Sequence, residues 1–128
     1  MALRDQIRIM VVDDMSTSRG LIVQGLEAMG VSQVSTAENG VDALTALAAS
    51  PVHLIISDYH MPQMDGLQLL HSLRSAPQTA QTGFILVTGS ADQDLVHKGA
   101  SLGMNNYLPK PFDVPKLRDC IEAVVGRL

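Results

Sequence analysis

The sequence lacks the features that mark secreted, membrane or nucleic-acid-binding proteins. It has no tryptophan and one cysteine, Cys120, which has no partner for an internal disulfide. Its apolar runs are far shorter than the roughly 20 residues of a membrane-spanning helix, and Met-Ala-Leu-Arg-Asp-Gln does not resemble a signal peptide. No cluster of Lys and Arg exceeds two residues, and the net charge is −4, so the electrostatic footprint of a nucleic-acid binder is missing. We therefore expect a cytoplasmic protein with no membrane insertion and no nucleic-acid partner.

Few aromatic residues are available for the core. The 128 residues include two Phe and two Tyr, although 46% are hydrophobic, so we expect an aliphatic core in one domain over 1–128. A chain of this size buries about two thirds of its unfolded surface. Cys120 lies among Leu117, Ile121 and Val124, which indicates a small buried side chain; a redox thiol is the alternative.

The hydrophobic pattern alternates between the periods of strands and helices along the whole chain. Strand-like runs occur at about 7–12, 33–37, 53–57, 83–88 and 105–109. Helical patterns occur at about 17–29, 40–49, 66–75, 92–102 and 114–127. Five strand–helix units without an internal repeat predict an α/β fold with a single five-stranded, doubly wound parallel sheet.

Residues at the expected helix ends agree with this pattern. Ser16 or Thr17 is a suitable cap for the first helix, and Gly30 is suited to end it. Asp65 is a suitable cap for the third helix, and Pro115 suits the first turn of the fifth.

Five polar residues stand where the strand-like runs stop: Asp13, Asp14, Asp58, Thr88 and Lys110. The runs that they follow are 7–12, 53–57, 84–87 and 106–109. Because the carboxyl ends of parallel strands share one edge of the sheet, we expect these side chains to converge where open α/β sheets bind ligands.

Three converging carboxylates need a cation or a proton, since each pair about 5 Å apart costs roughly 3 kcal/mol at an effective dielectric of 20. Oxygen ligands without a His or Cys cluster favour Mg²⁺. A carboxylate at such a site can attack phosphorus to give an aspartyl phosphate, with Lys110 and Thr88 holding phosphoryl oxygens. Taken singly, an acidic pair often only starts a loop, and Lys110 fits a solvated surface lysine. The prediction rests on the occurrence of all five polar residues at the ends of strand-like runs.

Four segments resemble the receiver domains of two-component response regulators. They are Val-Val-Asp-Asp-Met-Ser-Thr-Ser-Arg (11–19), Ile-Ser-Asp-Tyr-His-Met-Pro-Gln-Met-Asp-Gly (56–66), Val-Thr-Gly (87–89) and Lys-Pro-Phe (110–112). Within that family, Asn-Gly-Val-Asp-Ala-Leu (39–44) and Met-Asp-Gly-Leu-Gln-Leu-Leu (64–70) are similar to the chemotaxis regulators. The resemblance spans the whole chain and implies a (βα)5 flavodoxin-like fold with the known strand order 2-1-3-4-5.

The resemblance also implies how phosphate and metal are held. Asp58 would be the phosphoacceptor. Asp13, Asp14 and Asp58 would hold Mg²⁺, together with the backbone carbonyl of His60. The protein would be a phosphoacceptor that assists its own phosphorylation and dephosphorylation, and not an enzyme.

Further residues would sense the phosphoryl group. Thr88 and Lys110 would contact it, and the Lys110–Pro111 bond is expected to be cis. Tyr107 matches the family's switch aromatic, which turns inward when the Thr88 hydroxyl moves; the alternative is an ordinary half-buried ring on the last strand.

Two positions beside the site differ from the better-known members of the family. The resemblance implies that the positions of His60, two residues after Asp58, and Ser90, two residues after Thr88, tune the lifetime of the phosphoryl group. We hypothesise that His60 changes the hydrolysis rate by screening or hydrogen-bonding the attacking water; a solvated imidazole without a kinetic role is the alternative. The other histidines, His53, His71 and His97, have no ligand spacing and are expected at the surface.

These features predict a monomeric, stand-alone response regulator that a histidine kinase phosphorylates. Its readout surface would be formed by the fourth helix, fifth strand and fifth helix (about 92–127), including Tyr107, Lys98 and Lys116. A chemotaxis kinase upstream and the flagellar motor switch protein FliM, or another protein target, downstream are the expected partners. A phosphate sink that drains the kinase without touching the motor is the alternative.

Two alternative functions belong to other classes of protein. A Mg²⁺-dependent phosphatase of the haloacid-dehalogenase type would have Asp-x-Asp after the first strand, where this chain has Asp13-Asp14-Met15, and would need a cap domain. A flavodoxin-like cofactor protein would have a Ser/Thr/Gly-rich phosphate loop there, and acidic residues would repel the FMN phosphate.

Overall fold

The computed structural model describes residues 2–90 and 92–128 and has five parallel strands in one sheet. The strands are β1 (Arg8–Val12), β2 (Gln33–Ala37), β3 (Leu54–Asp58), β4 (Gly83–Thr88) and β5 (Asn106–Pro109). Their order in the sheet is β2-β1-β3-β4-β5, and every neighbouring pair is parallel. The predicted fold class and the strand order implied by the resemblance are both confirmed.

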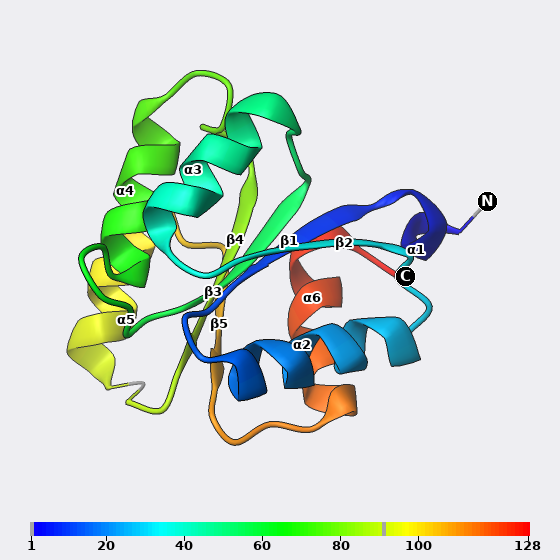
Figure 1. Cartoon of the computed structure of the whole chain (residues 1–128). Helices are drawn as coiled ribbons and strands as arrows, with labels where there is room; N and C mark the ends of the chain where they lie inside the picture. Colours follow the sequence, from blue (N-terminus) through cyan, green and yellow to red (C-terminus); the bar gives the residue numbers. More distant parts are fainter. Residues whose placement is uncertain (1, 91) are drawn as a thin grey trace.

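Helices cover both faces of the sheet (Figure 1). One face carries α2 (Ser16–Ala28) and α6 (Val114–Val125), and the other carries α3 (Gly40–Ala49), α4 (Gly66–Ser75) and α5 (Gln93–Ser101). A one-turn helix, α1 (Leu3–Gln6), precedes β1. It was not predicted, because four residues are too few to show a helical period. Within the described ranges, no helix has the length and apolarity needed to span a bilayer.

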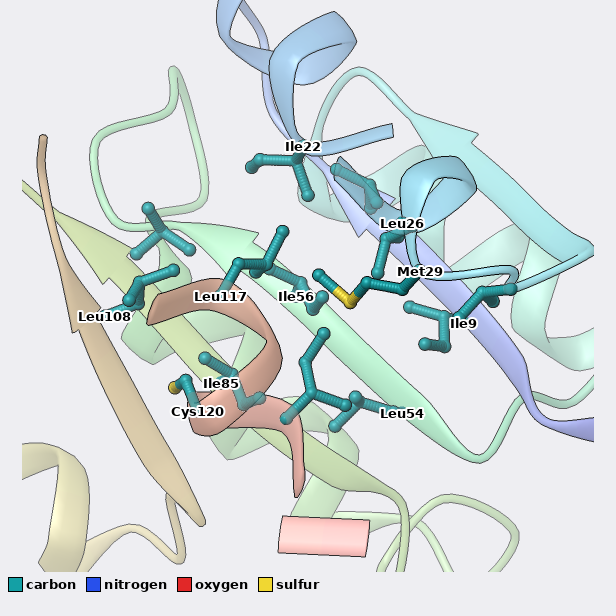
Figure 2. Close-up of a cluster of buried hydrophobic side chains, with 14 of the residues drawn as sticks. Ile9, Ile22, Leu26, Met29, Leu54, Ile56, Ile85, Leu108, Leu117 and Cys120 are labelled. Atoms are coloured by element: carbon teal, nitrogen blue, oxygen red, sulfur yellow. The ribbon is translucent and has the colours of Figure 1, made fainter. Parts of the chain in front are cut away.

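The three central strands are almost entirely buried, as is typical of parallel strands covered on both faces. Ile56 and Ile85 point to one face and pack with Leu117 of α6 (Figure 2). Their neighbours Ile55 and Phe84 point to the opposite face, toward α3 and α4. This aliphatic packing on both faces fixes the strands, and therefore the residues at their carboxyl ends.

Cys120 is buried, as predicted, and its Sγ donates a hydrogen bond to the Tyr107 carbonyl at 3.5 Å. Burial raises the pKa of this thiol to about 11. Because the thiolate is the reactive form, this pKa argues against the redox alternative.

Three predicted helix ends are confirmed. Asp65 caps α4 in a reciprocal capping box with Gln68, and Pro115 lies in the first turn of α6. Gly30 follows α2 with a φ of +87°, the left-handed conformation that favours glycine after a helix.

The predicted cap of α2 is wrong. Ser16 is already helical, and Met15 occupies the cap position without a side-chain cap. Asp13 takes over part of this role, since its Oδ1 accepts the Met15 N–H at 3.0 Å. The start of α2 is thereby tied to a residue of the predicted acidic site.

Candidate functional site

The loop after β1 and the end of β3 bring three carboxylates together. One oxygen from each of Asp13, Asp14 and Asp58 lies within 4.8 Å of the other two. Asp13 and Asp58 are buried, and Asp14 is exposed. The convergence predicted from the strand ends is therefore present, and its cause is the direct pairing of β1 with β3.

Asp13 is fixed from several directions. Its N–H donates to the Ala37 carbonyl of β2 at 3.1 Å, and its carbonyl accepts from Arg19 Nη1 at 2.8 Å. Its Oδ2 is buried and has no hydrogen-bond partner among the described residues. An unpartnered buried carboxylate oxygen is costly, and beside two other carboxylates it fits a hard divalent cation such as Mg²⁺.

Asp58 lies against Lys110, with 3.2 Å between Oδ1 and Nζ. Burial raises the pKa of the Asp58 carboxyl; the hydrogen bond and charge of Lys110 oppose this effect, and the charge of Asp13 adds to it. The carboxylate form of Asp58 is thus costly without a further cation, which is a second reason why this pocket fits a metal ion.

Thr88 lies at the end of β4 and is connected to two other parts of the site. Its buried hydroxyl accepts the Ser90 N–H at 3.0 Å, and its carbonyl accepts the Lys110 N–H at 2.8 Å. The Lys110–Pro111 bond is cis, as the resemblance implied. The Tyr107 side chain is exposed on β5, which leaves its proposed inward turn a prediction.

The side chains of His60 and Ser90 are exposed at the rim of the site. The His60 ring is tilted against Tyr59, with 4.7 Å between the ring centroids. The expected metal contact of the His60 carbonyl stays a prediction. Of the other histidines, which are exposed as expected, His53 also accepts the Arg8 N–H through Nδ1 at 2.9 Å.

Three residues at the site were missed by the sequence reasoning: Ser18, Arg19 and Gly66. Ser18 Oγ lies 3.3 Å from Lys110 Nζ, and Arg19 contacts the Asp13 carbonyl. A Cβ on Gly66 would lie 2.6 Å from the carbonyl oxygen of Asp58, so any side chain there would displace the strand end. Of these three residues, Gly66 alone had a signal in the sequence, because it is a glycine in the first turn of an otherwise well-capped helix.

An open groove with a volume of about 730 Å³ borders the site between α2 and the start of α6. Lys110 lies in its wall, which is otherwise mainly apolar. Three of its apolar side chains, Met15, Leu21 and Val114, are exposed. Exposed apolar side chains gathered beside a charged site indicate a surface for protein contact.

Comparison with known proteins agrees with this geometry. Residues 9–122 match the sequence model of the response regulator receiver domain. The chain is 40% identical to a probable chemotaxis protein CheY of Rhizobium etli, over 100% of this chain and 99% of that protein. It is 31% identical to the chemotaxis protein CheY of Pseudomonas aeruginosa, over 95% and 98% of the two chains. The crystal structure of CheY4 from Vibrio cholerae superposes with a TM-score of 0.87 at 27% identity, covering 92% and 98%.

Proposed function

The chain belongs to the response regulator receiver family, and we propose that it accepts a phosphoryl group from a histidine kinase on Asp58. Members of this family are phosphoacceptor signalling proteins and not classical enzymes. The observation that carries the proposal is the Asp58 carboxylate, buried beside two other carboxylates and 3.2 Å from a lysine ammonium. In the proposed step an Asp58 oxygen attacks phosphorus, the phosphorus–nitrogen bond of the donor phosphohistidine breaks, and its electron pair returns to the imidazole.

The other residues of the site would support this transfer. Asp13, Asp14 and Asp58 would hold Mg²⁺, with the His60 carbonyl as a further ligand, and the ion would offset charge between carboxylate and phosphoryl oxygens. Lys110 would hold another phosphoryl oxygen. The Thr88 hydroxyl would move toward the phosphoryl group, leaving the Ser90 N–H, and so start the switch.

We further propose that residues 1–128 act as a single-domain, monomeric regulator in the cytoplasm. The readout surface would be α5, β5 and α6, where Tyr107, Lys98 and Lys116 are exposed. The similarity to chemotaxis proteins favours a chemotaxis kinase as donor and FliM of the flagellar motor as target. Pull-downs of FliM with the phosphorylated and unphosphorylated forms separate this role from that of a phosphate sink, which would not retain FliM in either form.

Acetyl phosphate tests the proposal directly. With Mg²⁺ present, the intact mass of the protein should rise by one phosphoryl group. Release of inorganic phosphate should then be limited by the decay of that single group. Rapid multiple turnover on small phosphate esters would instead support the phosphatase alternative, and no mass increase with either acetyl phosphate or a cognate kinase would refute the proposal.

His60 is expected to slow hydrolysis of the phosphoryl group. Its exposed imidazole lies at the rim two residues from Asp58, and asparagine is smaller, so water should reach the phosphorus more easily in His60→Asn. We expect dephosphorylation to accelerate by about threefold, which corresponds to less than 1 kcal/mol in the barrier. The measurement is decay of the phosphorylated form by intact mass, with exposed His71→Asn as the control. An unchanged rate removes the hypothesis.

The apolar groove is expected to receive the donor protein. A kinase domain that brings its phosphohistidine to Asp58 covers the surface around Lys110, which includes the groove. Leu21→Glu should therefore slow phosphorylation by a cognate kinase by at least about fivefold, as loss of a central interface residue does. The rate with acetyl phosphate should stay unchanged, because this donor needs no docking.

Val41→Glu is the matched control for this experiment. Val41 is about as exposed as Leu21 but lies on α3, on the opposite face of the sheet. Equal slowing by both variants, or slowing of Leu21→Glu with acetyl phosphate too, would contradict docking at the groove.

A further inference from the structure

The ammonium group of Lys110 has a second partner besides Asp58. Its Nζ lies 3.2 Å from Asp58 Oδ1 and 3.3 Å from Ser18 Oγ. Ser18 lies in the first turn of α2, 92 residues away in the sequence. We propose that Ser18 is a positioning residue of the phosphoryl-transfer site, which holds the Lys110 ammonium in place beside Asp58. This inference rests on the proposed function.

Lys110 needs a second contact because its side chain is long and partly exposed. Its side chain is 31% exposed, and a lysine has a flexible four-carbon stem that is readily drawn into water. Its backbone, in contrast, is fixed by the N–H bond to the Thr88 carbonyl. One ion pair at the tip leaves the direction of the ammonium open, and a second contact from another helix determines it.

A serine hydroxyl suits this role chemically. The Ser18 oxygen accepts a hydrogen bond from the ammonium but is neutral, so it does not compete with Asp58 for the positive charge. The ammonium has three hydrogens, of which Asp58 and Ser18 engage two. The third remains available for an oxygen of the incoming phosphoryl group, and its direction is set by the other two.

The first experiment measures phosphorylation by acetyl phosphate at saturating Mg²⁺. Ser18→Ala should lower the rate constant by about three- to tenfold, the range expected for one hydrogen bond. Ser18→Thr keeps the hydroxyl and should retain the rate within about twofold of the original chain. Ser16→Ala is the matched control, because Ser16 is exposed in the same turn of α2 and does not line the groove.

The second experiment reads the position of Lys110 without any phosphorylation. Brief treatment with acetic anhydride, followed by peptide mass spectrometry, gives the labelling of Lys110 relative to the exposed Lys98 and Lys116. Ser18→Ala should raise the relative labelling of Lys110 by about threefold, whereas Ser16→Ala should leave it unchanged.

The two readouts separate this inference from the proposed function. A chain that labels as expected but takes up no phosphoryl group would refute the proposed function and keep the Ser18–Lys110 contact. Unchanged labelling in Ser18→Ala overturns the positioning role, whatever happens to the rate. A rate that stays unchanged in a phosphorylatable Ser18→Ala protein overturns it as well.

Discussion

Asp58→Asn is expected to take up no phosphoryl group from acetyl phosphate or from the kinase, while the chain stays folded. The carboxamide has nearly the shape of the carboxylate, and its oxygen still accepts a hydrogen bond from Lys110. It is not a competent nucleophile toward phosphorus, so the loss should be complete by intact mass. A mass increase of one phosphoryl group in this variant would mean that another residue is the acceptor, and would refute the assignment.

The same variant carries a stability prediction whose sign depends on pH. Burial raises the pKa of Asp58 in the folded protein above its ordinary value of 3.8. The folded state therefore binds this proton more tightly than the unfolded state, and wild-type stability falls as the pH rises through the folded pKa. Asp58→Asn has no such loss. In EDTA, urea unfolding should find the variant at least as stable as wild type at pH 7, with its advantage shrinking as the pH falls through the folded pKa of Asp58 toward about pH 4.

The fold was predictable because short apolar strand-like runs and helical patterns alternate along the whole chain. The runs that became β3 and β4 are buried on both faces, and their composition reflects this directly. The predictions that failed concern a helix too short to show a period and a helix start that is fixed by contacts from outside the helix. Helix α1 is a single turn, and the cap position of α2 falls on Met15 in the acidic loop, where the Asp13 side chain accepts the Met15 N–H.

The charged residues of the candidate site were predictable from the sequence, but the residues that hold them in position were not. Asp13, Asp58 and Lys110 follow strand ends, so topology alone brings them together. Ser18 gave no comparable signal, because it is one of three hydroxyl residues in Ser-Thr-Ser and only the pitch of α2 turns it toward Lys110. The contact of Arg19 with the Asp13 carbonyl likewise depends on how the helix leaves its loop.

Backbone contacts within the sheet also keep the three carboxylates close together. Asp13 is tied to β2 through Ala37, and Asp58 is part of β3, so neither backbone relaxes readily to relieve the repulsion. Two buried carboxylates and one exposed one are thus held within 4.8 Å by the same packing that fixes the sheet. The protein without metal is expected to be destabilised by its own binding site.

Asp13→Asn is therefore expected to stabilise the metal-free protein and to remove its response to Mg²⁺. Asparagine keeps an oxygen for the Met15 N–H, and its amide replaces the unpartnered Oδ2 with a donor facing the remaining carboxylates. Removing one charge at about 5 Å should stabilise the fold in EDTA by about 1 to 2 kcal/mol, less than the roughly 3 kcal/mol per charge pair at a dielectric of 20. It should also lower the pKa of Asp58, which the Asp13 charge raises.

Urea unfolding in EDTA and in excess Mg²⁺ measures both the stability of the metal-free protein and the stability gained from Mg²⁺. Mg²⁺ stabilises a chain that binds it only when folded, so wild type should gain stability on adding the ion and Asp13→Asn should gain little. The order of the two proteins is then expected to reverse between the two conditions. Asp119→Asn, which removes an exposed aspartate on α6, should follow wild type in both. An Asp13→Asn protein that gains as much from Mg²⁺ as wild type would exclude Asp13 as a ligand, and one that is destabilised in EDTA would contradict the repulsion that the carboxylate geometry implies.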